Sequence, residues 1–155
     1  ISISIGILIL VATLTYLAVP RSEALAKSKF VIGSWNVVIT VVNQNATFPG
    51  FITFFNDGNV IADEVPSPLE TSGHGSWVGA GNNRYAYRFD FLYGSTEPGK
   101  WMKGTVSGSV NYDQETDQWS GPFAIVIVDQ DGNEVLSDMG IMNGRRIPAE
   151  LDPTR

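Results

Sequence analysis

A tryptophan near the start of this chain's strand pattern and an arginine at its end constrain the fold most. Gly33-Ser34-Trp35 begins a long apolar segment, and Gly144-Arg145-Arg146-Ile147 ends the last one. An indole and a guanidinium so far apart in the sequence meet only if the sheet between them closes on itself. Arginine stacks on aromatic rings through cation–π contact. The two motifs therefore predict a barrel whose closed end holds Trp35 together with Arg145 or Arg146.

Strand-like segments alternate with turn sequences between the two motifs. Strands are predicted at residues 31–42, 51–55, 60–65, 76–78, 84–93, 101–112, 118–129 and 134–147. Asp57-Gly58 between apolar runs is a strong hairpin cue. No segment after residue 30 has a helical pattern. We therefore predict an all-β fold, an eight-stranded antiparallel up-and-down β-barrel in which closure removes exposed edges. A two-sheet sandwich is the main alternative, although its Greek-key crossovers need longer connections.

One face of the predicted strand 84–93 is aromatic, and charged side chains occupy the other face. An aromatic row of this kind is expected to face the barrel interior, where a small ligand would bind. The candidate ligand-binding residues are Tyr85, Tyr87, Phe89, Phe91, Met102 and Tyr112. Gly104 and Gly108 share a face with Met102. They leave room for rings or for a ligand, or they permit the strand to coil.

The composition narrows the function classes. The net charge of −6 over 155 residues argues against a nucleic-acid partner, which calls for a basic surface. Absence of cysteine excludes disulfides, iron–sulfur clusters and thiol catalysis. The one histidine, His74, is interpreted as structural, with a haem ligand as the alternative. The chain has no G-x-S-x-G motif. We therefore predict no catalytic residue, metal or cofactor, and a non-catalytic role is favoured.

Residues 1–20 carry no charge and are long enough to cross a bilayer. Ala24-Leu25-Ala26 resembles a signal cleavage site, so a cleaved secretory signal is one interpretation. An uncleaved helical anchor is the interpretation we adopt, because the length, the lack of charge and Tyr16 near an interface all suit it. Alternation of isoleucines over residues 1–7 leaves a strand that pairs with a neighbour as a third possibility. The predicted plan is an anchor at 1–20, a tether at 21–29, a barrel at 30–147 and a tail at 148–155.

Gly33-Ser34-Trp35 resembles the G-x-W motif of lipocalins, and Arg145 or Arg146 resembles the arginine that packs on that tryptophan. The chain is thus similar to the calycin superfamily, which includes lipocalins, fatty-acid-binding proteins and avidins. It also resembles small bacterial lipocalin-like proteins with an H-G-x-W stretch, here residues 74–77. It differs from lipocalins in lacking the T-D-Y motif, the C-terminal helix and any disulfide. The resemblance implies a barrel, and it leaves the activity open.

Three functions follow as hypotheses. The leading one is a membrane-anchored, non-catalytic accessory subunit whose barrel caps a larger membrane protein complex on the extracytoplasmic side. Its partners would be membrane lipid and integral membrane protein subunits. The first alternative is a lipocalin-type carrier of a small apolar ligand. The second is a barrel-type cyclase or isomerase.

Overall fold

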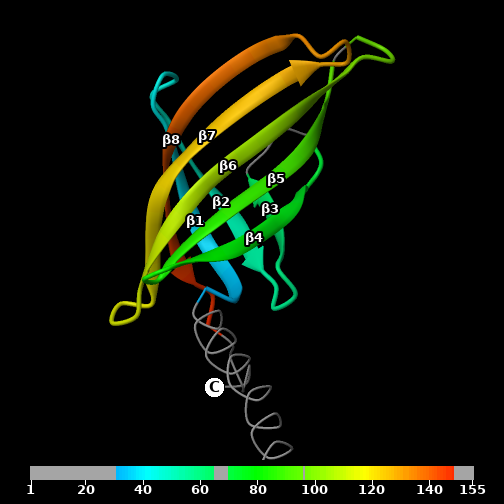
Figure 1. Cartoon of the computed structure of the whole chain (residues 1–155). Coiled ribbons are helices and arrows are strands. Elements are labelled where there is room, and N and C mark those ends of the chain that lie inside the picture. The colour runs from blue at the N-terminus through cyan, green and yellow to red at the C-terminus, as the bar shows by residue number, and fades with distance from the viewer. Residues whose placement is uncertain (1–30, 65–69, 96, 149–155) are drawn as a thin grey trace, which may run out of the picture.

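The computed structural model describes residues 31–64, 70–95 and 97–148. All regular structure in these ranges is β-strand, and the strands form one closed antiparallel barrel in sequence order (Figure 1). The strands are β1 (Gly33–Val41), β2 (Ala46–Phe54), β3 (Asn59–Glu64), β4 (Gly73–Gly81), β5 (Arg84–Gly94), β6 (Trp101–Asp113), β7 (Gln118–Asp129) and β8 (Glu134–Arg146). The predicted all-β, eight-stranded antiparallel barrel is confirmed.

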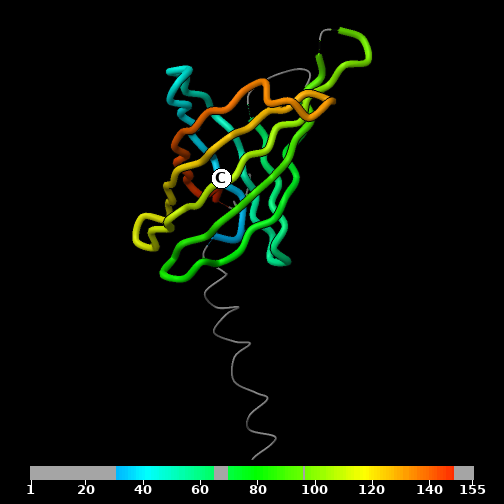
Figure 2. The backbone as a smooth tube through the Cα atoms, turned by 45° about the horizontal axis from the view of Figure 1, so that its top comes forward, coloured from blue at the N-terminus to red at the C-terminus, as the bar shows by residue number. Residues whose placement is uncertain are grey.

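The first and last strands form the seam that closes the barrel. β1 pairs with β8 in antiparallel register, from Trp35 opposite Arg146 to Val41 opposite Gly140. The same strand pairs with β2 along its other edge. Figure 2 shows the resulting tube of strands. A sandwich of two separate sheets lacks such pairing between first and last strands, so this alternative is excluded.

Two strands are longer than the sequence pattern predicts. β2 begins at Ala46 rather than at residue 51, although Pro49 and Gly50 interrupt its pattern. Its pairing with β3 ends at Gly50, so Pro49 lies where β2 has a described partner on one side only. Proline is tolerated at such edge positions because it has no N–H to donate. β4 covers Gly73–Gly81 rather than residues 76–78, despite its many glycines.

The interior is filled by side chains that alternate along each strand. Large rings face inward beside inward-facing glycines of the neighbouring strand. Phe91 lies opposite Gly104, and Tyr87 lies opposite Gly108. A Cβ atom at either glycine would collide with the facing ring. These two glycines therefore accommodate aromatic rings of the protein itself, which resolves the alternatives left open by the sequence.

One end of the barrel is closed by Arg146 and Trp35. The Arg146 Cζ lies 4.1 Å from the centroid of the Trp35 ring. Its Nη1 donates to the carbonyl of Ile32 at 2.7 Å, and its Nε donates to both Asp117 carboxylate oxygens at 2.8 and 2.9 Å. The Trp35 indole N–H donates to the Val31 carbonyl at 2.8 Å. Arg145, the other candidate, is exposed.

The carboxylate at this end is held in its charged form. Burial alone would raise the pKa of Asp117, but hydrogen bonds from Arg146 and Tyr112 outweigh it and lower that pKa. Tyr112 donates to Asp117 at 2.8 Å. Its ring also packs edge-on against Trp35, with centroids 5.9 Å apart. The cation–π contact, the ion pair and the ring packing therefore join the side chains of Trp35, Tyr112, Asp117 and Arg146 at this end of the barrel.

The predicted anchor at residues 1–20, the tether at 21–29 and residues 149–155 of the tail lie outside the described residues. Within the described ranges, no helix has the length and apolarity that crossing a bilayer requires.

Replacing Trp35 with alanine tests whether the closed end supports the barrel. Trp35 is fully buried, so Trp35→Ala should lower the free energy of unfolding by about 3–5 kcal/mol in urea denaturation. Trp101→Ala is the matched control, because the Trp101 side chain is 46% exposed and its loss should cost well under half as much. Equal losses for the two variants would contradict this account of the closed end.

Candidate functional site

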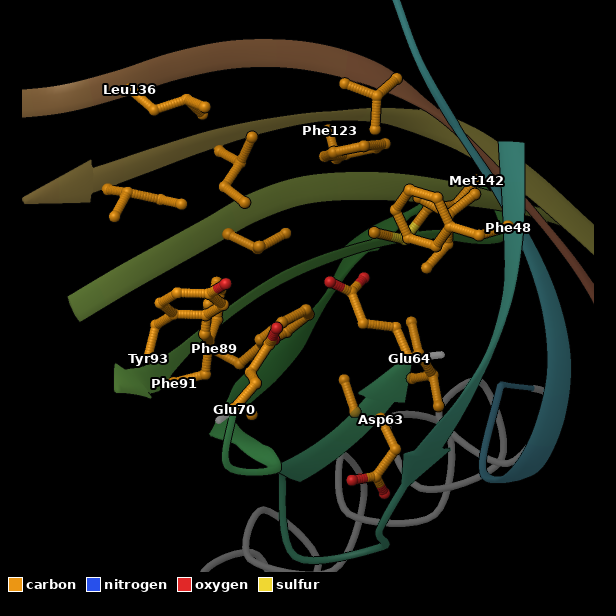
Figure 3. Close-up of a pocket in the computed structure, with 18 of the residues that line it drawn as sticks. Phe48, Asp63, Glu64, Glu70, Phe89, Phe91, Tyr93, Phe123, Leu136 and Met142 are labelled. Atoms are coloured by element: carbon orange, nitrogen blue, oxygen red, sulfur yellow. The ribbon is translucent and has the colours of Figure 1, made fainter. Parts of the chain in front are cut away.

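The opposite end of the barrel contains an apolar cavity of about 490 Å³. This volume lies in the range of small-molecule sites in proteins. Figure 3 shows side chains from several strands directed into the cavity. Its apolar wall includes Ile39, Phe48, Ile52, Phe89, Phe91, Tyr93, Met102, Val106, Phe123, Ile125, Ile127, Leu136 and Met142. An eight-stranded barrel is just wide enough to hold one small ligand in this way.

The structure places three of the six predicted ligand-binding residues in the cavity wall. These are Phe89, Phe91 and Met102. β5 crosses the barrel from the closed end to the open end, so its inward row is shared between the two halves. Phe89 and Phe91 lie in the half that opens to solvent, and Met102 lies opposite Tyr93 across the β5–β6 pair.

The other three predicted residues, Tyr85, Tyr87 and Tyr112, do not line the cavity. The Tyr85 ring packs edge-on against Trp77. The Tyr87 hydroxyl donates to the Met142 sulfur at 3.4 Å, and burial raises the Tyr87 pKa. Tyr112 belongs to the closed end already described. These tyrosines therefore pack the inner half of the barrel.

Two carboxyl groups that are not among the predicted site residues, those of Glu64 and Glu70, lie in the cavity. Glu64 continues the inward row of Val60 and Ala62 on β3. Glu70 forms an isolated antiparallel bridge with Tyr93, which places both side chains on the same side. Both glutamates line the cavity, and Figure 3 shows their carboxyl groups directed into it. The alternation on β3 could have identified Glu64. Glu70 lies outside any strand and carries no comparable signal.

The surroundings shift both pKa values upward. Protein atoms crowd the Glu64 carboxyl and displace part of its hydration, which raises its pKa although the residue as a whole is exposed. Burial, and then the charge of Glu64, raise the pKa of Glu70 to about 7. The charge of Glu64 therefore adds to the effect of burial on Glu70 and disfavours the ionised form of Glu70.

The described residues that line this cavity include no lysine, arginine or histidine. Asp63 also lines it, but its carboxylate accepts a hydrogen bond from Ser72 at 2.5 Å and points away from the other two (Figure 3). Asp138, on the inward row of β8, accepts hydrogen bonds from the backbone N–H groups of Met139 and Asn43. The charged side chains among the described residues of the cavity wall are thus all acidic.

His74 lies on the outer face of β4. It is exposed, whereas its neighbour Gly73 is buried and lines the cavity. An imidazole at this position cannot ligate a group held inside the barrel. In the described part of the chain, no group of three or more His, Cys, Asp or Glu residues is arranged to hold a metal ion.

No protein-family model, curated protein or solved structure matches this chain. The closed eight-stranded antiparallel barrel is compatible with a calycin or lipocalin-like fold. This compatibility is one of architecture, and it does not assign an activity.

Proposed function

We propose that the protein binds a small apolar ligand inside the open half of its barrel. The observation that carries the proposal is the cavity itself, which is walled by aromatic and aliphatic side chains. Packed rings at the closed end form the bottom of the site, because Trp119 packs edge-on against both Trp35 and Phe54. A ligand would therefore enter from the open end and stop at packed rings.

The energetics favour a ligand with an extended apolar body. Each Å² of apolar surface removed from water contributes about 25 cal/mol. Several wall residues, including Phe89 and Phe91, are already buried in the folded protein. Binding then immobilises few additional side chains, which lowers its entropic cost. An alkyl chain or a small ring system fits this description, and decanol is a suitable neutral probe.

Filling the cavity from its wall should weaken binding of decanol to the full chain. Ile127 lines the cavity and is only partly buried, so Ile127→Trp can reduce the space without disrupting the core. The expected result in isothermal titration calorimetry is at least a tenfold loss of affinity, with a negative heat-capacity change for binding to the wild type.

The adjacent residue Val126 provides the matched control. Side chains alternate along β7, and Val126 is absent from the cavity wall. Val126→Trp should leave the affinity for decanol within about twofold of the wild type, since the Val126 side chain is outside the cavity wall. Equal effects of the two tryptophans, or no decanol binding by the wild type, would contradict the proposal.

The accessory-subunit hypothesis is the second candidate, and the outer surface favours it. Val38, Met139 and Ile141 are exposed apolar side chains on the paired strands β1 and β8. Contiguous exposed apolar groups often mark protein–protein contacts. In this proposal an anchored barrel on the extracytoplasmic side uses this face to contact an integral membrane subunit. The cyclase or isomerase hypothesis stays a prediction.

Affinity purification of the full chain from detergent-solubilised membranes tests this second candidate. A larger membrane assembly should copurify with the wild type. The double variant Val38→Ser and Ile141→Ser should lose it while its free energy of unfolding changes by only about 1 kcal/mol. Recovery of the wild-type chain alone would count against the accessory role.

A further inference from the structure

We propose that the ligand is an amphiphile with a cationic amine head, which Glu64 and Glu70 bind at the open end of the cavity. This inference rests on the proposed function and names the ligand class for the same cavity. An apolar body would lie against the aromatic wall, and the ammonium group would donate hydrogen bonds to the carboxylates.

The positions of the two glutamates are the first argument. Each directs its carboxyl group into a cavity whose wall is otherwise mostly apolar. Glu64 follows Val60 and Ala62 on the inward row of β3. Glu70 faces the same way as Tyr93, its bridge partner. The carboxyl groups therefore lie at the junction between the apolar wall and solvent, where an amphiphile's head group would be.

The lack of a basic partner is the second argument. No described residue of the cavity wall carries a positive charge. The lysines near the start of β6 are engaged outside the cavity. The ammonium of Lys100 pairs with Glu97 at 2.5 Å, and that of Lys103 pairs with Asp90 at 3.3 Å. A ligand cation would supply the positively charged partner that Glu64 and Glu70 lack among the described residues of the cavity wall.

The same geometry disfavours an anionic ligand. A carboxylate or phosphate head would meet the carboxyl groups of Glu64 and Glu70. Like charges at short range in a partly desolvated site repel. A neutral head group avoids this repulsion but makes no ion pair.

The charge state of Glu70 makes binding depend on pH. Its pKa of about 7 in the free protein means that a proton competes with a ligand cation for the same carboxyl. The titratable groups that line the cavity with Glu70 are Glu64, Asp63 and Tyr93, and Asp138 lies on the inward row of β8. None of these four groups carries a positive charge. Below pH about 7 protonation of Glu70 should weaken amine binding, and above it the carboxylate is fully available. An alkylamine stays protonated throughout, with a pKa near that of lysine, about 10.4.

Calorimetric titration of the full chain with decylamine, decanol and decanoate tests the inference. At pH about 8, decylamine should bind about tenfold or more tightly than decanol, because hydrogen bonds to charged groups are the stronger ones. Decanoate should bind more weakly than decanol. At pH about 5 the advantage of decylamine should shrink, while decanol binding stays constant.

Two variants assign the effect to the glutamates. The double variant Glu64→Gln and Glu70→Gln should remove the advantage of decylamine over decanol and the pH dependence of that advantage. Glu115→Gln is the control for removal of a carboxyl group away from the cavity, because Glu115 lies in the β6–β7 turn beside the closed end. It should retain the full advantage.

The outcomes separate the two proposals. If decanol binds but decylamine binds no more tightly, the cationic head is wrong and the apolar site stands. The same conclusion follows if the double variant keeps the advantage of decylamine. If decanol itself does not bind the wild type, the apolar site fails, and the inference that depends on it fails too.

Discussion

The stacking of Arg146 on Trp35 is the contact on which the rest of this structure depends. It joins the beginning of β1 to the end of β8, and these two residues are also Cα partners across the seam. A slip of one residue would turn every inward side chain of a strand outward. Cation–π contact of this kind contributes about 0.5–2 kcal/mol. The ion pair with Asp117 holds the guanidinium in place and ties the β6–β7 turn to the seam.

Closure at this end divides the barrel interior into a part packed with side chains and a part that contains the cavity. Three of the four tryptophans, Trp35, Trp77 and Trp119, are buried in a network of edge-on ring contacts. Phe54 contacts both Trp77 and Trp119 in this network. Aliphatic residues such as Ile39 and Ile125 form part of the wall of the other half, where the cavity lies. Because the packed half blocks one end of the cavity, a small molecule can bind in the other half but cannot pass through the barrel.

Much of the fold could be predicted from the sequence because its determinants are local or paired. Alternation in residues 84–93 and the Asp57-Gly58 turn predict strands and a hairpin, and Trp35 with a C-terminal arginine predicts closure. The first half of β2 was not predicted, because Pro49 and Gly50 interrupt the strand pattern. The sequence does not show that pairing with β3 ends at Gly50, which is why a proline is tolerated beside it.

The candidate site was harder to predict for a geometric reason. Alternation tells which side of a strand a residue faces, but the depth of that residue in the barrel depends on strand tilt and register. Tyr85 and Phe91 share an inward row, yet Tyr85 packs on Trp77 and Phe91 lines the cavity. Glu70 was not predicted as a site residue, because its inward position depends on a bridge to Tyr93 that no local sequence pattern indicates.

The three methionines offer the most direct test of the claim that ligand occupies the open half of a closed barrel. Met102 and Met142 line the cavity, whereas Met139 is 60% exposed on the outer face of β8. In a chain with isotope-labelled methionine methyl groups, NMR titration with decanol should shift the Met102 and Met142 signals and leave the Met139 signal unchanged. A shift confined to Met139, or equal small shifts of all three signals, would contradict the account.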